Sequence, residues 1–429
     1  MARLLLATLL LLHMILLSCN ANFFLNPFMD PGNEGALADP EAPFEEEPDA
    51  YNLHHRKKKI RKQRQQKKKN DGIGLDWPQF PLLDDPIEIP PEVPQNPLPD
   101  APKNKLPEDP QDALPDGPPD DNLKGLRVGF YNQSCPRAEE IMAETMAEMF
   151  RTNPRAPANI LRLQFHDCFV GGCDASILLD STPSGENVEK SSPMNFILLK
   201  GADLIDDIKL KLEQECPQTV SCADIIAFAA REALALTGLP RLPQPGGRRD
   251  ALVSLSANVD VLKNLPIPDW TMDQLIELFK RKGFTEEEMV ILTGAHSIGG
   301  AHCGVFTPRL NNYENSGKPD PGLDPAFLNQ ISGICLDPKE ANRNPLVDFD
   351  ETPTKMDNLF YKNLMQYKAL LSTDQALLTD PRTAQFVEAM ANNPDEFAKR
   401  LAALMIRMGA MEALTGTAGE VRKTCRSTV

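Results

Sequence analysis

The chain has 429 residues and a formal net charge of −16 at pH 7, and 19 of its 39 prolines lie between residues 23 and 122. A chain of this length could hold two or three domains, but a tract so rich in proline is not expected to fold, which excludes a globular domain there. That tract carries 21 acidic and 12 basic residues and the remainder from residue 123 carries 40 and 32, so net charge does not indicate a catalytic domain that binds polyanions.

Residues 1–21 have the pattern of a secretory signal peptide. Arg3 supplies one positive charge, a leucine-rich run follows from Leu4 to Leu17, and small polar residues lead to a cleavage site after Ala21. A transmembrane anchor is the alternative, but the apolar run is too short and His13 interrupts it. We therefore expect a secreted, extracellular protein with no membrane segment after signal removal.

Residues 22–122 form an acidic, basic and proline-rich arm that we expect to be disordered. Its basic run, residues 54–69, contains ten Lys or Arg residues. The simplest interpretation is a solvated charge run. The alternatives are an electrostatic contact with an acidic wall polysaccharide and a nucleic-acid patch, and secretion argues against nucleic acid.

Residues 123–429 have apolar positions at helical spacing, which predicts a mainly α domain. Thr271 is expected to cap a helix that stops at Gly283, and Thr285 with Glu288 has the pattern of a capping box. The segment 222–236 is apolar nearly all round, as a buried central helix is. One cysteine network over about 300 residues favours a single large domain.

Eight cysteines remain once the signal peptide has removed Cys19, and all of them follow residue 134. Eight cysteines in an exported protein can form four disulfides, with 105 possible pairings. They are Cys135, Cys168, Cys173, Cys216, Cys222, Cys303, Cys335 and Cys425.

Only His166, His296 and His302 are available for histidine chemistry in this domain. Arg162 and His166 are four residues apart, so a helix would place them on one face, with Phe165 suggesting partial burial. A base beside a fixed cation can move a proton while negative charge develops on a neighbouring atom. An ordinary polar pair on a helix surface is the alternative.

A glycine-containing acidic turn follows, from Asp167 to Ser176. Two carboxylates, a hydroxyl and backbone carbonyls can converge there, and hard oxygen ligands favour Ca²⁺. An acidic turn of this kind is also often only a loop.

Two longer motifs resemble the signatures of one family. The run RLQFHDCFVGGCDASILLD is similar to the distal haem signature of class III secretory plant peroxidases, and TGAHSIGGAHC is similar to their proximal signature. The similarity extends from about Phe130 to Cys425 and includes FYNQSCP, VSCADIIAFAAR, GGRRD, NLPIPD and STDQALL. The resemblance implies a single large helical haem-peroxidase domain with one haem b.

The resemblance also implies roles for individual residues. His296 would ligate the haem iron, with Asp374 accepting its other ring proton and Phe165 completing the haem-binding set. His166 would move the peroxide proton while Arg162 stabilises the developing charge. Asn195 would bond to His166, with Glu189 supporting Asn195. His302 matches no catalytic role.

Disulfides and calcium sites follow from the same resemblance. The implied pairs are Cys135 with Cys216, Cys168 with Cys173, Cys222 with Cys425, and Cys303 with Cys335. The implied distal Ca²⁺ ligands are Asp167, Val170, Gly172, Asp174 and Ser176. The implied proximal ligands are Ser297, Asp350, Thr352 and Asp357.

One departure concerns the proximal calcium loop. The family normally has two residues between its first aspartate and the threonine, but here only Glu351 separates Asp350 from Thr352. We expect a second Ca²⁺ site, with the participation of Asp350 left open.

The expected activity is reduction of hydrogen peroxide with one-electron oxidation of small phenolic donors by a monomer in the cell wall or apoplast. Pro266 would lie at the substrate entrance, and Asn132 begins the only glycosylation sequon we find. A peroxidase fold that has lost turnover and serves as a wall-binding scaffold is one alternative. A nucleic-acid binder is the other.

Overall fold

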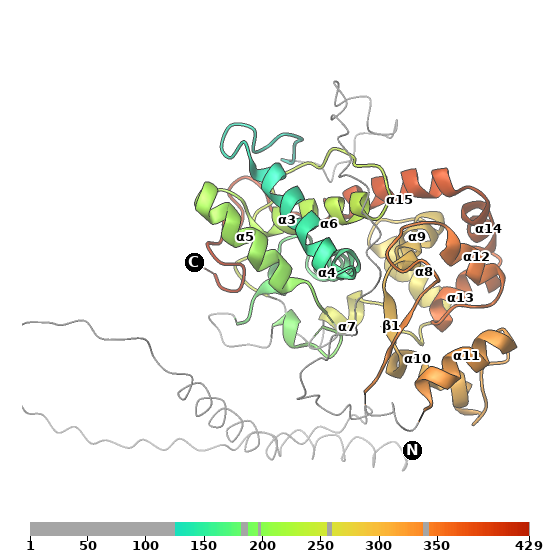
Figure 1. Ribbon diagram of the computed structural model, residues 1–429. Coiled ribbons are helices and arrows are strands. Elements are labelled where there is room, and N and C mark those ends of the chain that lie inside the picture. The colour runs from blue at the N-terminus through green and yellow to red at the C-terminus, as the bar shows by residue number, and fades with distance from the viewer. Residues whose placement is uncertain (1–124, 182–187, 196–198, 255–259, 338–342, 429) are drawn as a thin grey trace, which may run out of the picture. The chain divides into compact units, whose positions relative to one another are not determined.

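A computed structural model describes residues 125–181, 188–195, 199–254, 260–337 and 343–428 (Figure 1). The expectations for the signal peptide, the arm and its basic run lie outside these residues. Within them, no helix is both long and apolar enough to cross a membrane.

The first group of helices surrounds a buried central helix, as expected. Ser221 caps that helix by accepting a hydrogen bond from the Asp224 backbone N–H, and the helix packs against four others. The group, teal through green to yellow in Figure 1, consists of α3 (Ala138–Thr152), α4 (Ala156–Val170), α5 (Ala202–Glu215), the central α6 (Cys222–Leu236) and α7 (Asp260–Asn264).

A second group follows in yellow to red. It consists of α8 (Met272–Arg281), α9 (Glu286–Thr293), α12 (Leu359–Met365), α13 (Ser372–Thr379) and α14 (Ala384–Asn392). The last helix, α15 (Pro394–Met408), contacts both α9 and α6 and so joins the two groups.

Local capping explains where two of these helices begin. Thr271 and Thr285 each accept a hydrogen bond from the backbone N–H of the third helical residue. In turn, the backbone N–H of each threonine donates to the side-chain oxygen of that residue, Gln274 or Glu288. Both predicted starts are confirmed. The helix α8 ends before Gly283, whose φ of +85° suits the predicted stop.

Shorter elements lie between the helices. The strands β1 (Gly300–His302) and β2 (Leu346–Asp348) pair antiparallel beside a small apolar cluster to which α10 (Cys303–Asn311) and α11 (Pro325–Cys335) contribute. Single 3₁₀ turns are η3 (Ser176–Leu178), η4 (Glu189–Ser191), η5 (Gly294–Ser297) and η6 (Tyr313–Asn315). The mainly α prediction is confirmed.

Four disulfides cross-link the domain, as predicted. They join Cys135 to Cys216, Cys168 to Cys173, Cys222 to Cys425 and Cys303 to Cys335. These are the pairs that the family resemblance implied. The Cys222–Cys425 bond spans 203 residues and attaches the C-terminal segment to the start of α6.

Candidate active site

The helix α4 carries the first half of the site. Arg162 Nε donates to His166 Nε2 at 3.2 Å, so Nε2 is the acceptor nitrogen of the ring. The proton therefore lies on Nδ1, which is 2.7 Å from Asn195 Oδ1 and donates to it. The structure thus brings Arg162, His166 and Asn195 together.

The surroundings keep the His166 ring neutral. Burial, and then the neighbouring Arg162 charge, lower its pKa to about 3, against a smaller opposing effect of Asn195. A neutral imidazole with Nε2 as acceptor is ready to take a proton at that atom.

The Arg162 side chain has exposed surface, yet desolvation by the surrounding protein lowers its pKa. The half-buried Phe165 packs edge to face with the His166 ring at 5.8 Å between centroids.

Asn195 is itself held in place by Glu189, through a backbone atom. Asn195 Nδ2 donates to the Glu189 carbonyl at 2.9 Å. The Glu189 carboxylate is wholly buried and accepts a hydrogen bond from Ser254 Oγ at 3.2 Å. The orientation of the His166 ring therefore depends on three consecutive contacts.

The second half of the site is in η5, after α9. His296 Nδ1 lies 3.0 Å from Asp374 Oδ2, and the Asp374 carboxylate is buried. The His296 side chain is 37% exposed. With Nδ1 occupied by Asp374, Nε2 remains to bind a ligand.

A residue that the sequence did not indicate stacks on this histidine. The Phe349 ring lies 4.4 Å from the His296 ring at an angle of 11°, and Phe360 makes an edge contact at 6.0 Å. The sequence offered one indication of a role for Phe349, which is that it directly precedes Asp350, a predicted proximal calcium ligand.

The two histidine-bearing segments approach each other. A Cβ added to Gly299, three residues after His296, would lie 2.9 Å from the Cβ of Ala158 on α4. Nearby, Arg155 Nη2 at the start of α4 bonds to Asp348 of β2 at 2.7 Å. The two halves therefore belong to one region of the domain.

The distal acidic turn contains unpaired oxygens. Asp167 Oδ2 accepts the Ala175 N–H and Asp174 Oδ1 accepts the Ser176 N–H, but the buried Asp167 Oδ1 and Ser176 Oγ bond to no described residue. Burial raises the pKa of Asp167, with Asp174 and Glu189 adding to the effect, and burial raises that of Asp174 to about 6. A bound cation would offset the cost of burying the charged carboxylates of Asp167 and Asp174.

The other predicted members of this turn are close in sequence. Val170 ends α4, and Gly172 has a φ of +102°, where a Cβ would overlap the Glu412 carbonyl. No group of three or more His, Cys, Asp or Glu residues in the described ranges has the arrangement of a metal centre. Here only two carboxylates are present, so hydroxyl and carbonyl oxygens would have to complete a site.

The proximal loop gathers its four predicted residues despite the shortened spacing. Thr352 Oγ1 lies 3.1 Å from Asp350 Oδ1 and 3.2 Å from Asp357 Oδ2, and Ser297 Oγ accepts the Asp357 N–H at 3.0 Å. Burial raises the pKa of Asp350 to about 6, and the neighbouring Asp357 adds to the rise. Asp350 thus lies in the cluster.

Two further sequence candidates lie apart from the histidine contacts. Pro266 is half-buried between α7 and α8, in a segment whose Pro268 carbonyl accepts from Ser372 Oγ at 2.8 Å. His302 Nδ1 donates to the Asn344 carbonyl at 2.8 Å, which is a structural contact.

Comparison with known proteins adds a family assignment to this geometry. A family model described as peroxidase matches residues 142–393. Peroxidase 57 of Arabidopsis thaliana is 42% identical over 301 residues, covering 70% of this chain and 92% of that protein. Peroxidase 72 of the same plant is 44% identical (69% and 88% covered), and a peroxidase of Armoracia rusticana is 42% identical (69% and 84% covered).

Proposed function

Because this chain belongs to the class III plant branch of the peroxidase family and is a haem peroxidase, we propose that it oxidises small phenolic donors in the cell wall or apoplast. The observation that carries the proposal is the opposite pairing of the two His166 nitrogens, one with Arg162 and one with Asn195. This arrangement provides a neutral base beside a fixed cation.

The residues present fit a haem. His296 keeps Nε2 available as an iron ligand. Asp374 accepts a hydrogen bond from Nδ1, which makes the imidazole a stronger electron donor to the iron. Arg155 Nη1 is buried and bonds to no described residue, so it could pair with a porphyrin carboxylate. When bound, the haem supplies the iron and the redox chemistry.

The chain's own residues would then move protons and stabilise charge. His166 Nε2 takes a proton from hydrogen peroxide and returns it to the departing oxygen. Arg162 stabilises the negative charge that develops as the O–O bond breaks. Asn195 keeps the Nδ1 proton in place, so that Nε2 stays the acceptor.

We propose two Ca²⁺ ions as further components. Asp167, Asp174, Ser176 and the carbonyls of Val170 and Gly172 would bind the distal ion. The distal ion is supported by two buried oxygens without a hydrogen-bond partner among the described residues, Asp167 Oδ1 and Ser176 Oγ. Ser297, Asp350, Thr352 and Asp357 would bind the proximal ion, and their mutual contacts support the inclusion of Asp350.

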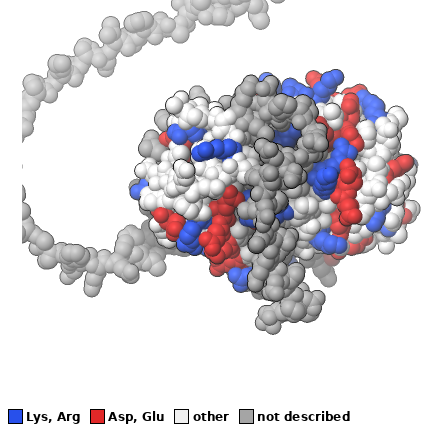
Figure 2. Space-filling model, turned by 90° about the horizontal axis from the view of Figure 1, so that it is seen from above, with Lys and Arg blue, Asp and Glu red and all other residues white. Residues whose placement is uncertain are grey.

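The remaining organisation is also proposed. Residues 123–429 would be the enzyme domain of a monomer, preceded by the signal peptide and the arm, with Pro266 at the donor entrance. The basic run 54–69 would contact acidic wall polysaccharide. Figure 2 shows acidic and basic side chains interspersed on one face of the domain, so the described residues visible there offer no uniformly basic area for that contact.

The test is an absorption spectrum of the purified protein before and after peroxide. We expect a haem band that changes on mixing, and consumption of two phenol molecules per peroxide because each donor gives one electron. His296→Ala should lose the haem band on gel filtration. A haem band that peroxide leaves unchanged would support the scaffold alternative, and no haem band in the unaltered protein would contradict the enzyme.

A further inference from the structure

A recess of about 400 Å³ lies between α4, the start of α5 and the C-terminal segment, and its volume is within the ~300–1,000 Å³ range of small-molecule sites. The described residues that line it have two characters. Leu163 and Ala202 contribute to an apolar part, while Lys190, Lys200 and Arg426 supply three positive charges. The recess can therefore accept a ligand with one apolar end and one charged end.

The recess lies beside the residues that hold His166. Asn195 forms part of its wall, but the side-chain amide of Asn195 is already engaged, through Oδ1 with His166 and through Nδ2 with the Glu189 carbonyl. The half-buried Asn159 also lines the recess, and its side-chain amide bonds to no described residue. Asn159 can therefore offer a ligand the hydrogen bond that Asn195 cannot.

Two of the lining cations pair with carboxylates that are nearer the solvent. Lys190 bonds to Asp180 at 2.5 Å, and their side chains are 24% and 59% exposed. Arg426, 27% exposed, bonds at 2.5 Å to Asp203, which is 98% exposed, and at 2.6 Å to Asp206, which is 35% exposed. Burial lowers the pKa of Lys190. The positive groups therefore border the recess more closely than the negative ones do, which favours an anionic ligand.

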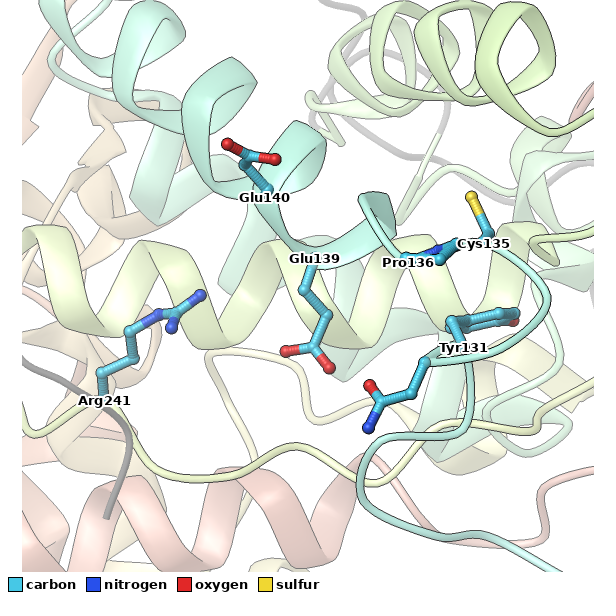
Figure 3. Close-up of a pocket in the computed structure, with 7 residues that line it drawn as sticks. Tyr131, Cys135, Pro136, Glu139, Glu140 and Arg241 are labelled. Atoms are coloured by element: carbon cyan, nitrogen blue, oxygen red, sulfur yellow. The ribbon is translucent and has the colours of Figure 1, made fainter. Parts of the chain in front are cut away.

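Lys200 is the lining cation that bonds to no described residue. An ammonium group without a carboxylate partner can form a charge-assisted hydrogen bond with an incoming anion. The recess beside α3 differs in this respect. Figure 3 shows Glu139 and Arg241 bordering one open space there, and these charges are already paired, with Arg231 at 2.8 Å and Glu232 at 2.7 Å.

We propose that the recess beside α5 binds a small carboxylic acid that carries an apolar ring or chain. The carboxylate bonds to the Lys200 ammonium and to the Asn159 amide, and the apolar part packs against Leu163 and Ala202. Burial of the apolar part and the charge-assisted bond both favour binding. The inference does not depend on the peroxidase reaction, and the recess contains no residue of the 266–268 segment at the proposed donor entrance.

The chemistry of the ligand is tested with cyclohexanecarboxylate, which has a ring and a carboxylate but no phenol for the enzyme to oxidise. Calorimetric titration of the full, haem-loaded protein should show one binding site. The neutral cyclohexanecarboxamide should bind about tenfold more weakly, the loss expected for one charge-assisted hydrogen bond. Added salt should weaken binding of the carboxylate but not of the amide. Equal affinities for the two compounds, or no binding of the carboxylate, would overturn the proposal.

The place of binding is tested with three variants. Ala202→Phe fills the recess from a half-buried position and should abolish binding of the probe, while Lys200→Gln changes an exposed side chain and should weaken it about tenfold. Leu210→Phe is the control, because Leu210 is on the same helix, is 61% exposed and does not line the recess. The haem band and the unfolding temperature check that each variant is folded.

Two results would contradict this placement. One is an affinity for cyclohexanecarboxylate in Ala202→Phe equal to that in Leu210→Phe, which would mean that the probe binds elsewhere on the protein. The other is an unchanged affinity in Lys200→Gln, which would remove the proposed partner of the carboxylate. Peroxidase turnover plays no part in these measurements, so a failure of the proposed function would leave them interpretable.

Discussion

At His166 the two ring nitrogens have different tasks because they have different partners. Asn195 holds the proton on Nδ1 at 2.7 Å, and Arg162 leaves Nε2 as the acceptor at 3.2 Å. In the proposed mechanism, loss of the His166 ring would remove proton transfer but no iron ligand. The effects of His166 and His296 on the enzyme should therefore be separable.

We expect His166→Ala to slow the reaction with peroxide by about 10²- to 10⁴-fold, the usual contribution of a positioned acid–base group, while haem stays bound. Stopped-flow mixing measures the rate, and the haem band measures retention. His302→Ala is the matched control, since the ring of His302 bonds to a backbone carbonyl away from the site. An unchanged rate in His166→Ala would refute the role.

Individual residues differ in how visible they are in the sequence. The Arg162–His166 pair follows from helical spacing alone. The Asn195 contact needed the family resemblance, because 29 residues separate it from His166. Phe349 was missed because its stacking on His296 depends on how β2 packs against η5, which no local pattern reports. The sequence left open whether Asp350 takes part in the proximal calcium site. In the structure the Thr352 backbone N–H donates to Asp350 Oδ1 at 2.8 Å, which holds the Asp350 carboxylate within the short loop.

Among the elements, the distal turn combines a disulfide with buried acidic side chains. Cys168–Cys173 closes it, and Asp167 is adjacent to His166. Without a cation, Asp167 Oδ1 and Ser176 Oγ remain unpaired in the interior, which costs free energy. The turn should therefore depend on bound calcium for stability.

Removal of calcium by a chelator should lower the unfolding temperature by about 5 °C. An ion present at 100 times its Kd contributes roughly 2.7 kcal/mol. Differential scanning calorimetry measures the shift, and added Ca²⁺ should restore it while Mg²⁺ should not. An unfolding temperature that the chelator leaves unchanged would contradict both proposed ions.

The segment between α7 and α8 is tied to the helix that carries Asp374. Ser372 Oγ donates to the Pro268 carbonyl at 2.8 Å. We expect Ser372→Ala to raise the KM for a phenolic donor by about threefold, the equivalent of one hydrogen bond of roughly 0.5–1.5 kcal/mol. The rate with peroxide should not change.

Steady-state kinetics at saturating peroxide provides this measurement. Thr379→Ala is the control, because Thr379 is on the same helix and its hydroxyl contacts only its own turn, at Ala376. A donor KM equal in Ser372→Ala and Thr379→Ala would show that the tie does not position the donor entrance.

In the whole molecule, helix content and the helix starts at Thr271 and Thr285 were predictable from local chemistry. The disulfide pairing was not, since the residues alone left 105 possibilities. The Cys222–Cys425 bond spans 203 residues, and only the three-dimensional arrangement or a related protein can identify such a pair.

The proposed contact with acidic wall polysaccharide belongs to the basic run 54–69, because the sequence from residue 123 onward is acidic overall. Deletion of residues 54–69 should lower the salt concentration at which the protein elutes from an acidic polysaccharide matrix, because the carboxylates of such a matrix attract lysine and arginine and salt screens that attraction. Turnover should not change. An unaltered elution position would rule out the proposed wall contact.

The bond between His296 and Asp374 joins residues 78 positions apart. A messenger RNA spliced so as to omit the coding sequence for α13 would still encode both imidazoles and the whole distal half. Its product would lack the Asp374 carboxylate that bonds to His296, the proposed iron ligand. A reading frame can therefore retain both signature motifs and yet specify a protein in which the proposed cofactor site is impaired.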